Sequence, residues 1–292
     1  MHRDHPPPPI AGWVAGRIGA ADLRWFEHSQ DHRQSRVWAV RRPGDDGPVA
    51  FLKVHRHHRK FTQERDAYRL WLGGCDATPR LLACDESTRS LLLTPLAGDV
   101  VERGERSGKD IRRCYREAGR FLRWLHDRPH EDTDPLPPAA AFTQRSTHWL
   151  AAADGLLKPS LLAAVAAQLA ESGPLNSLPR RPCHRDYSPR NWVDDGLRVA
   201  VIDFEHARAD LAVVDIERVL AAPLTVAAGA DATGAFLEGY GGPLSSHETA
   251  ALRLVRLQSS LSRVAWGVRH GDAAFEARGR RELTQWFAGD AS

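Results

Sequence analysis

The stretches HRDYSPRN (184–191) and VIDFE (201–205) decide the fold of this chain. Between them, apolar residues flank an Asp-Asp-Gly turn, and this pattern predicts a β-hairpin. Asp186 precedes Asn191 by five residues on the loop that enters the hairpin, so a carboxylate and an amide oxygen are expected at one end of it. The returning apolar strand brings Asp203 back beside Asn191. Three oxygen-bearing side chains are therefore predicted to converge at one edge.

Oxygen ligands of this kind suit Mg²⁺, which proteins hold with one or two carboxylates and with substrate phosphates. Phosphoryl transfer from ATP needs such a metal site, and also a separate carboxylate that accepts the proton of the attacking hydroxyl. It further needs a cation for the phosphates. Lys53 lies in the predicted strand FLKV (51–54), where alternation directs it toward a cleft, and Glu64 follows in the next predicted helix. A buried lysine needs such a partner, so an ion pair is predicted.

The chain changes character near its first third. Residues 1–12 are rich in His and Pro, and we interpret them as a loosely draped leader. Strands are then predicted at 36–41, 49–54, 80–84 and 90–94, with a helix at 61–72. Helices are predicted at 111–125, 142–153, 160–171, 211–220, 233–240 and 247–268, around the one hairpin. We therefore expect an α+β fold with two lobes: a small β-rich N-terminal, nucleotide-binding lobe (1–95) and a larger helical C-terminal lobe (96–292) for catalysis and substrate binding.

Composition limits the class of protein. With 292 residues, 42% of them apolar and 26% charged, the chain is long enough for two lobes and ordinary for a folded protein. No run of about 18 apolar residues exists, so no membrane span is expected. The N-terminal stretch lacks an apolar signal segment, so we expect a cytoplasmic protein. Four cysteines without a CxxC pair are expected to be reduced thiols, and a net charge of +3 gives no case for a nucleic-acid partner.

These motifs together carry a resemblance. From about residue 20 to 240 the chain resembles the aminoglycoside phosphotransferase family, within the wider protein-kinase-like fold that also includes choline kinases. HRDYSPRN is similar to the catalytic loop of that family, and VIDFE stands in the place of its metal-binding segment. LLLTPLAGD (91–99) resembles its hinge, and LHDRP (125–129) resembles the end of its first large-lobe helix.

The resemblance implies a role for each matched residue. Asp186 would be the catalytic base, Asn191 and Asp203 would hold Mg²⁺, Lys53 would contact the phosphates of ATP and Glu64 would anchor Lys53. The backbone at Thr94 and Leu96 would meet the adenine edge. Because Pro95 has no N–H, the hinge donor is expected to be Leu96. The chain departs from the family in the expected phosphate loop SQDHRQS (29–35), which has no glycine. Glu205 stands where protein kinases have Gly, and the resemblance implies that this is usual for small-molecule kinases of this type.

Several functions stay open. The first is an ATP-dependent O-phosphotransferase that acts on a hydroxyl of an antibiotic, an amino sugar, a nucleoside or a related metabolite, with antibiotic resistance as one biological role. The alternatives are a choline- or homoserine-like metabolite kinase and a non-catalytic, pseudokinase-type binding protein. A protein kinase is disfavoured because the Asp-Phe-Gly and Ala-Pro-Glu segments are absent. Acidic residues that could receive a polycationic substrate are Glu205, Asp210, Asp215 and Glu217, but the arginine-rich C-terminal stretch makes such a substrate less favoured.

Two expectations concern histidines. The run His55, His57 and His58 is interpreted as a solvated segment after a strand rather than as a metal site, since no cysteine or carboxylate nearby in the sequence completes a ligand set. His184 is expected to be structural, a buried side chain that hydrogen-bonds the loop around Asp186.

Overall fold

The structure is a computed structural model that describes residues 5–29 and 35–288 of the chain. It contains two compact units. The first comprises Met1–His130, Pro182–Arg208 and Ala221–Gly242, and the second comprises Glu131–Arg181, Ala209–Leu220 and Pro243–Ser292. The assignment of residues 1–95 to a nucleotide-binding lobe and of residues 96–292 to a catalytic and substrate-binding lobe stays a prediction.

The first unit is built on a five-stranded antiparallel sheet of the order β1-β2-β3-β5-β4. Its strands are β1 (Arg24–Glu27), β2 (Ser35–Arg41), β3 (Ala50–His55), β4 (Leu81–Asp85) and β5 (Ser90–Leu93). The four strands predicted from the sequence are confirmed, and β1 is an addition. β2 and β3 pair across the predicted turn, with Trp38 opposite Leu52 and Val37 opposite Lys53.

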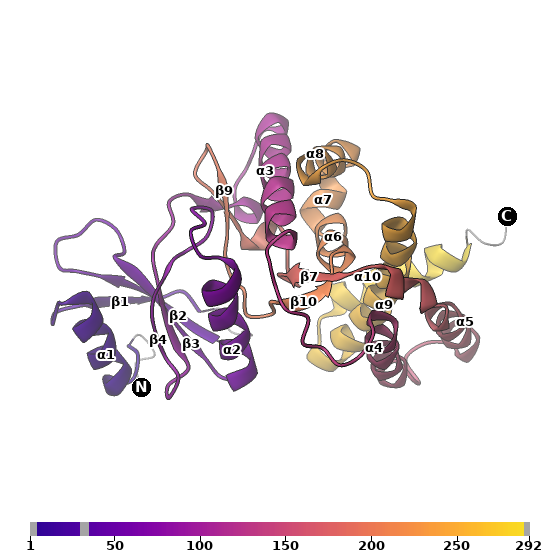
Figure 1. The fold of residues 1–292 in the computed structure, drawn as a ribbon, viewed down its shortest axis with the longest axis horizontal. Helices are drawn as coiled ribbons and strands as arrows, with labels where there is room; N and C mark the ends of the chain where they lie inside the picture. Colours follow the sequence, from indigo (N-terminus) through magenta and orange to yellow (C-terminus); the bar gives the residue numbers. More distant parts are fainter. Residues whose placement is uncertain (1–4, 30–34, 289–292) are drawn as a thin grey trace. The chain divides into compact units, whose positions relative to one another are not determined.

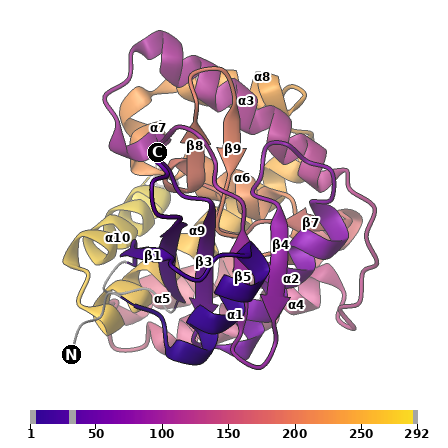
Figure 2. The same ribbon diagram turned by 90° about the vertical axis from the view of Figure 1, so that its left-hand side faces the viewer.

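One face of this sheet is covered by helix α1 (Pro8–Ile18), as Figures 1 and 2 show. Ile10 and Val14 of α1 are buried against Trp38 and Leu52 in one apolar cluster. The expected leader is therefore wrong from Pro8 onward. Proline is favoured in the first turn of a helix because its fixed φ suits the helix and its missing N–H would have no helical partner there. The apolar spacing then gives α1 a face to bury.

The opposite face of the sheet meets helix α2 (His58–Asp66), which continues as the π-helical turn η1 (Ala67–Trp71). Side chains alternate along β3: Leu52 points into the α1 cluster, whereas Phe51 and Lys53 line a cavity on the other side. The predicted orientation of Lys53 is confirmed. The helix predicted at 61–72 lies in this region, and Phe61 and Glu64 are both buried on α2.

The predicted hairpin is also part of the first unit. It consists of β8 (Trp192–Asp194) and β9 (Val199–Val201), which pair antiparallel, and β8 pairs further with β6 (Asp99–Val100). The short turns η2 (Val101–Arg103) and η4 (Pro189–Asn191) precede helix α3 (Gly108–His126) and strand β8, respectively. The helices α7 (Pro223–Ala228) and α8 (Ala230–Tyr240) complete the unit. The strands β7 (Arg180–Cys183) and β10 (Arg208–Leu211) form a two-stranded sheet.

Helices α3 and α8 lie side by side, and two glycines permit their close approach (Figures 1 and 2). A Cβ at Gly239 would lie 2.0 Å from the carbonyl oxygen of Arg116, and a Cβ at Gly119 would lie 2.2 Å from that of Phe236. Neither contact can be relieved by a side-chain rotation, because backbone atoms are on the other side.

Gly239→Ala is expected to destabilise the protein by about 1–3 kcal/mol, since the added methyl forces α3 and α8 apart. Gly234→Ala, on the same helix with no atom within 4 Å of the new Cβ, is the matched control. It should be neutral or stabilising by up to about 1 kcal/mol because alanine is the better helix former. Urea unfolding followed by circular dichroism measures both, and equal effects would contradict the close packing.

The second unit is helical in its main part. It contains α4 (Pro138–Ala152), α5 (Pro159–Ala170), the turn η3 (Gly173–Ser177), α6 (Val213–Leu220), α9 (Ser246–His270) and α10 (Ala273–Ala288). The sequence missed α10. A capping box formed by Ser245 and Glu248 begins α9. Arg263 of α9 pairs inside the unit with Glu217 at 2.5 Å and with Glu282 at 2.7 Å.

Two expectations about the whole chain can be compared with the described residues. All four cysteines are free thiols. Among residues 5–29 and 35–288, no helix combines the length and the apolar character that a membrane span requires.

Candidate active site

Lys53 is the centre of a buried ion cluster in the first unit. Its Nζ lies 2.6 Å from Glu64 Oε2, 2.6 Å from Asp203 Oδ1 and 3.4 Å from Glu205 Oε2. The lysine side chain is 8% exposed and that of Glu64 is 1% exposed. The predicted contact between Lys53 and Glu64 is thus present, and the two carboxylates from the VIDFE stretch are added to it.

The charges of this cluster set the pKa values of its members. Burial alone would lower the pKa of Lys53, but the attraction of Asp203, Glu64 and Glu205 outweighs burial and raises it. Burial would likewise raise the pKa of Glu64, and Lys53, followed by the hydrogen bond from His55, lowers it instead. Both groups are therefore held in their charged forms at neutral pH.

His55 differs from the sequence interpretation. It is 1% exposed, and its Nε2 lies 3.0 Å from Glu64 Oε2, whereas His57 and His58 are exposed as expected. The reason is strand alternation, since His55 follows Lys53 by two residues and points to the same side. His55, Glu64 and Glu205 also have metal-like spacing. The ammonium of Lys53 already supplies the cation there, so this group is an ion cluster and not a metal site.

The loop around Asp186 is fixed by backbone and side-chain hydrogen bonds. Asn191 Nδ2 donates to the Asp186 carbonyl oxygen at 2.9 Å and to Asp186 Oδ2 at 3.1 Å. His184 is buried, and its Nδ1 accepts from the Asp186 N–H at 3.2 Å. Its Nε2 lies 3.0 Å from the carbonyl oxygen of Ile202, which makes Nε2 the protonated nitrogen. His184 is therefore structural, as expected, and ties the Asp186 loop to the VIDFE strand.

Asp203 is brought beside Asn191 as the hairpin predicted. The Ile202 N–H donates to the Asn191 carbonyl oxygen at 3.0 Å, one residue beyond the paired strands. Asp203 has φ 70° and Arg185 has φ 63°, and only one other non-glycine residue among those described, Arg89, has a positive φ. Such a backbone costs on the order of 1–2 kcal/mol per residue. Its concentration in the two motif stretches is typical of functional sites.

The oxygen atoms at this edge fit a divalent cation. Asn191 Oδ1 is buried and has no hydrogen-bond partner, although Asn191 Nδ2 is fully engaged with Asp186. A buried amide oxygen without a partner costs free energy unless a ligand satisfies it. Asp203 follows two residues after the adjacent strand β9, so an amide oxygen and a carboxylate are offered near each other. This donor set is one that Mg²⁺ accepts.

A cavity of about 600 Å³ opens beside these groups within the first unit. The polar residues of its lining include Lys53, Arg190, Asn191 and Asp203. Its apolar walls include Val37, Phe51, Leu93, Val193 and Ile202. This combination of apolar walls and a few convergent polar groups is typical of small-molecule pockets, and the volume falls in their usual range.

The predicted hinge also lines this cavity, through Thr94 and Leu96. The N–H of Thr94 donates to the Arg80 carbonyl oxygen at 3.0 Å, and the Thr94 hydroxyl accepts from the Arg80 N–H at 2.9 Å. The N–H of Thr94 is therefore engaged in the sheet. A nucleotide base in the cavity needs another backbone N–H as its donor. This agrees with the expectation that Leu96 supplies the donor.

The expected phosphate loop falls mainly outside the described residues, because residues 30–34 are not among them. Its last residue, Ser35, begins β2, and its hydroxyl donates to Glu205 Oε2 at 3.3 Å. Glu205, which replaces the glycine of protein kinases, thus connects this strand to the Lys53 cluster. The sequence showed that Glu205 replaces this glycine, but it did not indicate that Glu205 contacts Ser35 and Lys53.

The acidic residues proposed for a polycationic substrate are buried. Glu205 is 9% exposed, Asp210 2%, Asp215 0% and Glu217 1%. Glu205 contacts Lys53, Arg145 Nη2 lies 3.2 Å from Asp210 Oδ1, and Arg263 pairs with Glu217. These four carboxylates do not form an acidic surface, so that part of the hypothesis is wrong.

Sequence reasoning assigned no role to two cations near the site. Arg190 Nη2 lies 2.5 and 2.7 Å from the two carboxylate oxygens of Asp186. Lys60 Nζ lies 2.6 Å from a ring nitrogen of His206 and 3.9 Å from Glu205 Oε1. Burial lowers the pKa of Lys60 to about 8 against the attraction of Glu205. In the sequence, the feature that could have indicated Lys60 is its position four residues before Glu64, which puts both residues on the same face of one helix.

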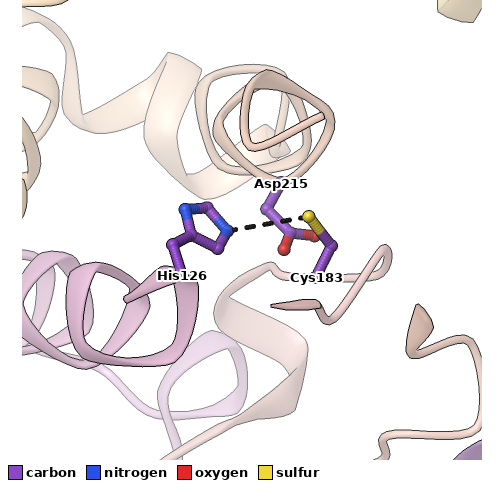
Figure 3. A group of neighbouring side chains, drawn as sticks. All are labelled: His126, Cys183 and Asp215. Carbon is purple, nitrogen blue, oxygen red and sulfur yellow. Dashed lines mark hydrogen bonds between the residues drawn. The ribbon is translucent and has the colours of Figure 1, made fainter. Parts of the chain in front are cut away.

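One further buried contact connects the catalytic stretch to helix α3. Cys183 Sγ lies 3.9 Å from His126 Nε2, as Figure 3 shows, and His126 Nδ1 lies 2.8 Å from the Tyr240 hydroxyl of α8. His126 belongs to the LHDRP stretch. Its ring therefore joins the end of β7, just before His184, to two helices of the same unit.

The fold, the ion cluster and the cavity together define a kinase-like phosphotransferase. The chain belongs to the phosphotransferase enzyme family, whose sequence profile matches residues 24–254. It is thus an enzyme, a small-molecule kinase that transfers a phosphoryl group to an alcohol, and the predicted family and enzyme class are confirmed.

Solved structures support the fold. The ADP-bound aminoglycoside phosphotransferase APH(2'')-Ib has a TM-score of 0.68 and 17% identity, over 96% of this chain and 97% of that chain. The GDP and kanamycin complex of APH(2")-IIia has a TM-score of 0.71 and 14% identity, over 97% and 99%. A choline/ethanolamine kinase family protein from Mesorhizobium loti has a TM-score of 0.62 and 18% identity, over 97% and 90%. The α+β, protein-kinase-like fold class is confirmed. No curated protein matches the chain by sequence.

Proposed function

We propose that this enzyme transfers the γ-phosphoryl group of ATP to a hydroxyl of a small molecule. The observation that carries the proposal is that Lys53, Asn191 and Asp203 line one cavity, with Lys53 paired to Asp203 and with Asp186 hydrogen-bonded to Asn191. A phosphate-binding cation, metal-binding oxygens and a carboxylate base are the parts that phosphoryl transfer requires. The cytoplasm, where ATP is abundant, is our proposed place of action.

Each residue has a distinct task in this proposal. Asp186 accepts the proton of the attacking hydroxyl, and the hydrogen bonds from Asn191 and from its own N–H to His184 hold it in place. Lys53 binds the phosphates, and Glu64 keeps it oriented. Leu96 and the backbone at Thr94 bind the adenine base of ATP.

Asn191 and Asp203 would hold Mg²⁺, whose chemistry is to neutralise the charge of the phosphates. The partnerless Asn191 Oδ1 supports this assignment. ATP is the proposed donor, although the related folds include one with ADP and one with GDP in the site.

The substrate class follows from charge. Since Glu205, Asp210, Asp215 and Glu217 are buried, these residues give no support to a polycationic acceptor. We therefore favour an acceptor with little positive charge, such as a nucleoside, a lightly charged antibiotic or a related hydroxylated metabolite. Antibiotic resistance remains one biological role within this proposal. The likeness to a choline/ethanolamine kinase family fold supports an amino alcohol as the second candidate.

A screen of ATP consumption tests the proposal. Wild-type enzyme with Mg²⁺ is mixed with panels of antibiotics, nucleosides and amino alcohols, and ADP release and the mass of the product are measured. We expect one class to gain about 80 mass units and to consume ATP in proportion. Absence of acceptor-dependent turnover together with tight nucleotide binding would favour a binding protein instead.

Asp203→Ala is expected to weaken Mg²⁺-dependent nucleotide binding more than Asn191→Ala does. A carboxylate offers the ion a full charge and an amide only a dipole. Titration of ATP with and without Mg²⁺ measures the difference, and binding without the metal should change little in either variant. Equal effects of the two substitutions would argue against the assignment.

A further inference from the structure

Arg190 lies at the junction between the cavity and the proposed base. It belongs to η4, directly before Asn191, and it lines the cavity together with Lys53 and Asp203. Its Nη2 also contacts both carboxylate oxygens of Asp186, at 2.5 and 2.7 Å. Asp186 itself is not among the residues that line the cavity. Among the positively charged side chains of the lining, Arg190 is therefore the one that also contacts Asp186, next to Asn191, whose amide does so as well.

An ordinary surface ion pair does not account well for this position. The Arg190 side chain is 51% exposed, so the pair contributes little to stability. A carboxylate that accepts hydrogen bonds from a guanidinium on both oxygens is a poor proton acceptor, since its negative charge is already compensated. Asp186 can therefore act as a base only if the guanidinium of Arg190 leaves it and binds another anion.

The charged groups around the cavity indicate which anion the guanidinium would bind. The other proposed catalytic groups at the cavity are Asn191 and the Lys53 cluster, in which three carboxylates surround one ammonium. A terminal phosphoryl group bound there needs a further cation, and a guanidinium presents planar, paired donors that match phosphoryl oxygens. The other cavity arginines, Arg103 and Arg106, belong to the segment that follows the hinge, and Arg106 donates to the Asp99 carbonyl oxygen at 3.2 Å.

We propose that Arg190 is a further catalytic residue whose guanidinium moves from Asp186 to the γ-phosphoryl group when nucleotide fills the cavity. This inference rests on the proposed function. The acceptor oxygen then forms a bond to the γ-phosphorus, and the bond from that phosphorus to the bridging oxygen breaks, with its electron pair retained by ADP. The acceptor proton passes to Asp186, which Arg190 has released. Arg190 neutralises the phosphoryl oxygens throughout.

The test compares nucleotides that differ only in the γ-phosphoryl group. Binding of the non-hydrolysable ATP analogue AMP-PNP and of ADP, each with Mg²⁺, is measured by calorimetry for the full-length wild type, Arg190→Met and Arg190→Lys. We expect Arg190→Met to lose about tenfold or more in AMP-PNP affinity, the size of one lost charged hydrogen bond, with ADP affinity unchanged. Arg190→Lys should retain part of the preference. Arg198→Met, an exposed arginine on the same hairpin, is the control and should change neither.

Asp186→Asn supplies an independent measurement, because it removes the group that competes for Arg190. AMP-PNP affinity in this variant should be equal to that of the wild type or tighter. If Arg190 only positioned Asp186, Arg190→Met would lower turnover without changing the preference for AMP-PNP over ADP, and that result overturns the inference. If the wild type bound neither nucleotide, the proposed function itself would be wrong.

Discussion

Asp186→Asn lowers turnover by about 10²- to 10⁴-fold, the usual contribution of a general base, and leaves nucleotide binding nearly intact. The asparagine keeps the shape of the side chain and can still accept the hydrogen bond from Asn191 Nδ2, so the loop retains its geometry. It cannot accept a proton from the acceptor hydroxyl. Because Asp186 does not belong to the cavity lining, nucleotide affinity is not expected to fall.

Steady-state kinetics with the acceptor found in the screen, together with nucleotide titration, measure this effect. Asp195→Asn is the matched control. Asp195 is an exposed residue of the hairpin turn whose Oδ1 accepts the N–H groups of Leu197 and Arg198, which an asparagine oxygen can also do. Its activity should equal that of the wild type. A loss below about tenfold in Asp186→Asn would show that another group accepts the proton.

Lys53→Met should damage both activity and stability. Three carboxylates lie within 3.4 Å of Lys53 Nζ, and its removal leaves them together without their cation. Breaking a buried ion pair from one side typically costs about 3–5 kcal/mol. The lowered pKa of Glu64 fixes the pH dependence. In the wild type the Glu64 contribution is present at neutral pH and is lost as the pH falls through that lowered value, and Lys53→Met should abolish this dependence.

A double-mutant cycle separates the pair from its surroundings. Glu64→Gln should show a weaker form of the same kinetic defect, with raised apparent ATP constant and lower turnover, since Glu64 acts on nucleotide only through Lys53. In Lys53→Met/Glu64→Gln the two losses should fall short of additivity. Lys109→Met, at an exposed position of α3, controls for the loss of a lysine and should stay within about 0.5 kcal/mol of the wild type in urea unfolding. Full additivity would show that Lys53 acts without Glu64.

Local rules in the sequence were sufficient for much of the site. Period-two alternation directed Lys53 away from the α1 cluster, and the Asp-Asp-Gly turn set the register that brings Asn191 and Asp203 together. Helical periodicity located the helix that contains Glu64. Each of these inferences depends on neighbours within about a dozen residues, where backbone geometry leaves few choices.

The same local rules failed at the N-terminus and at His55. A composition rich in His and Pro suggested a leader, yet α1 forms because the sheet offers an apolar face to Ile10 and Val14. His55 was interpreted as part of a solvated run; strand alternation puts it on the same side as Lys53, and a carboxylate of α2 contacts it there. In both cases the deciding surface is supplied by another element, which a local pattern does not contain.

The sequence by itself determined the family, the hairpin and the identity of the oxygen-bearing side chains. Only the tertiary structure decided which of the charged side chains pair with one another and which are buried. Lys53 and Asp203 are 150 residues apart in the chain but 2.6 Å apart in space, and the burial of Asp210 and Glu217 depends on arginines from other helices. Electrostatic pairing depends on distance and on exclusion of water, and packing across the chain sets both.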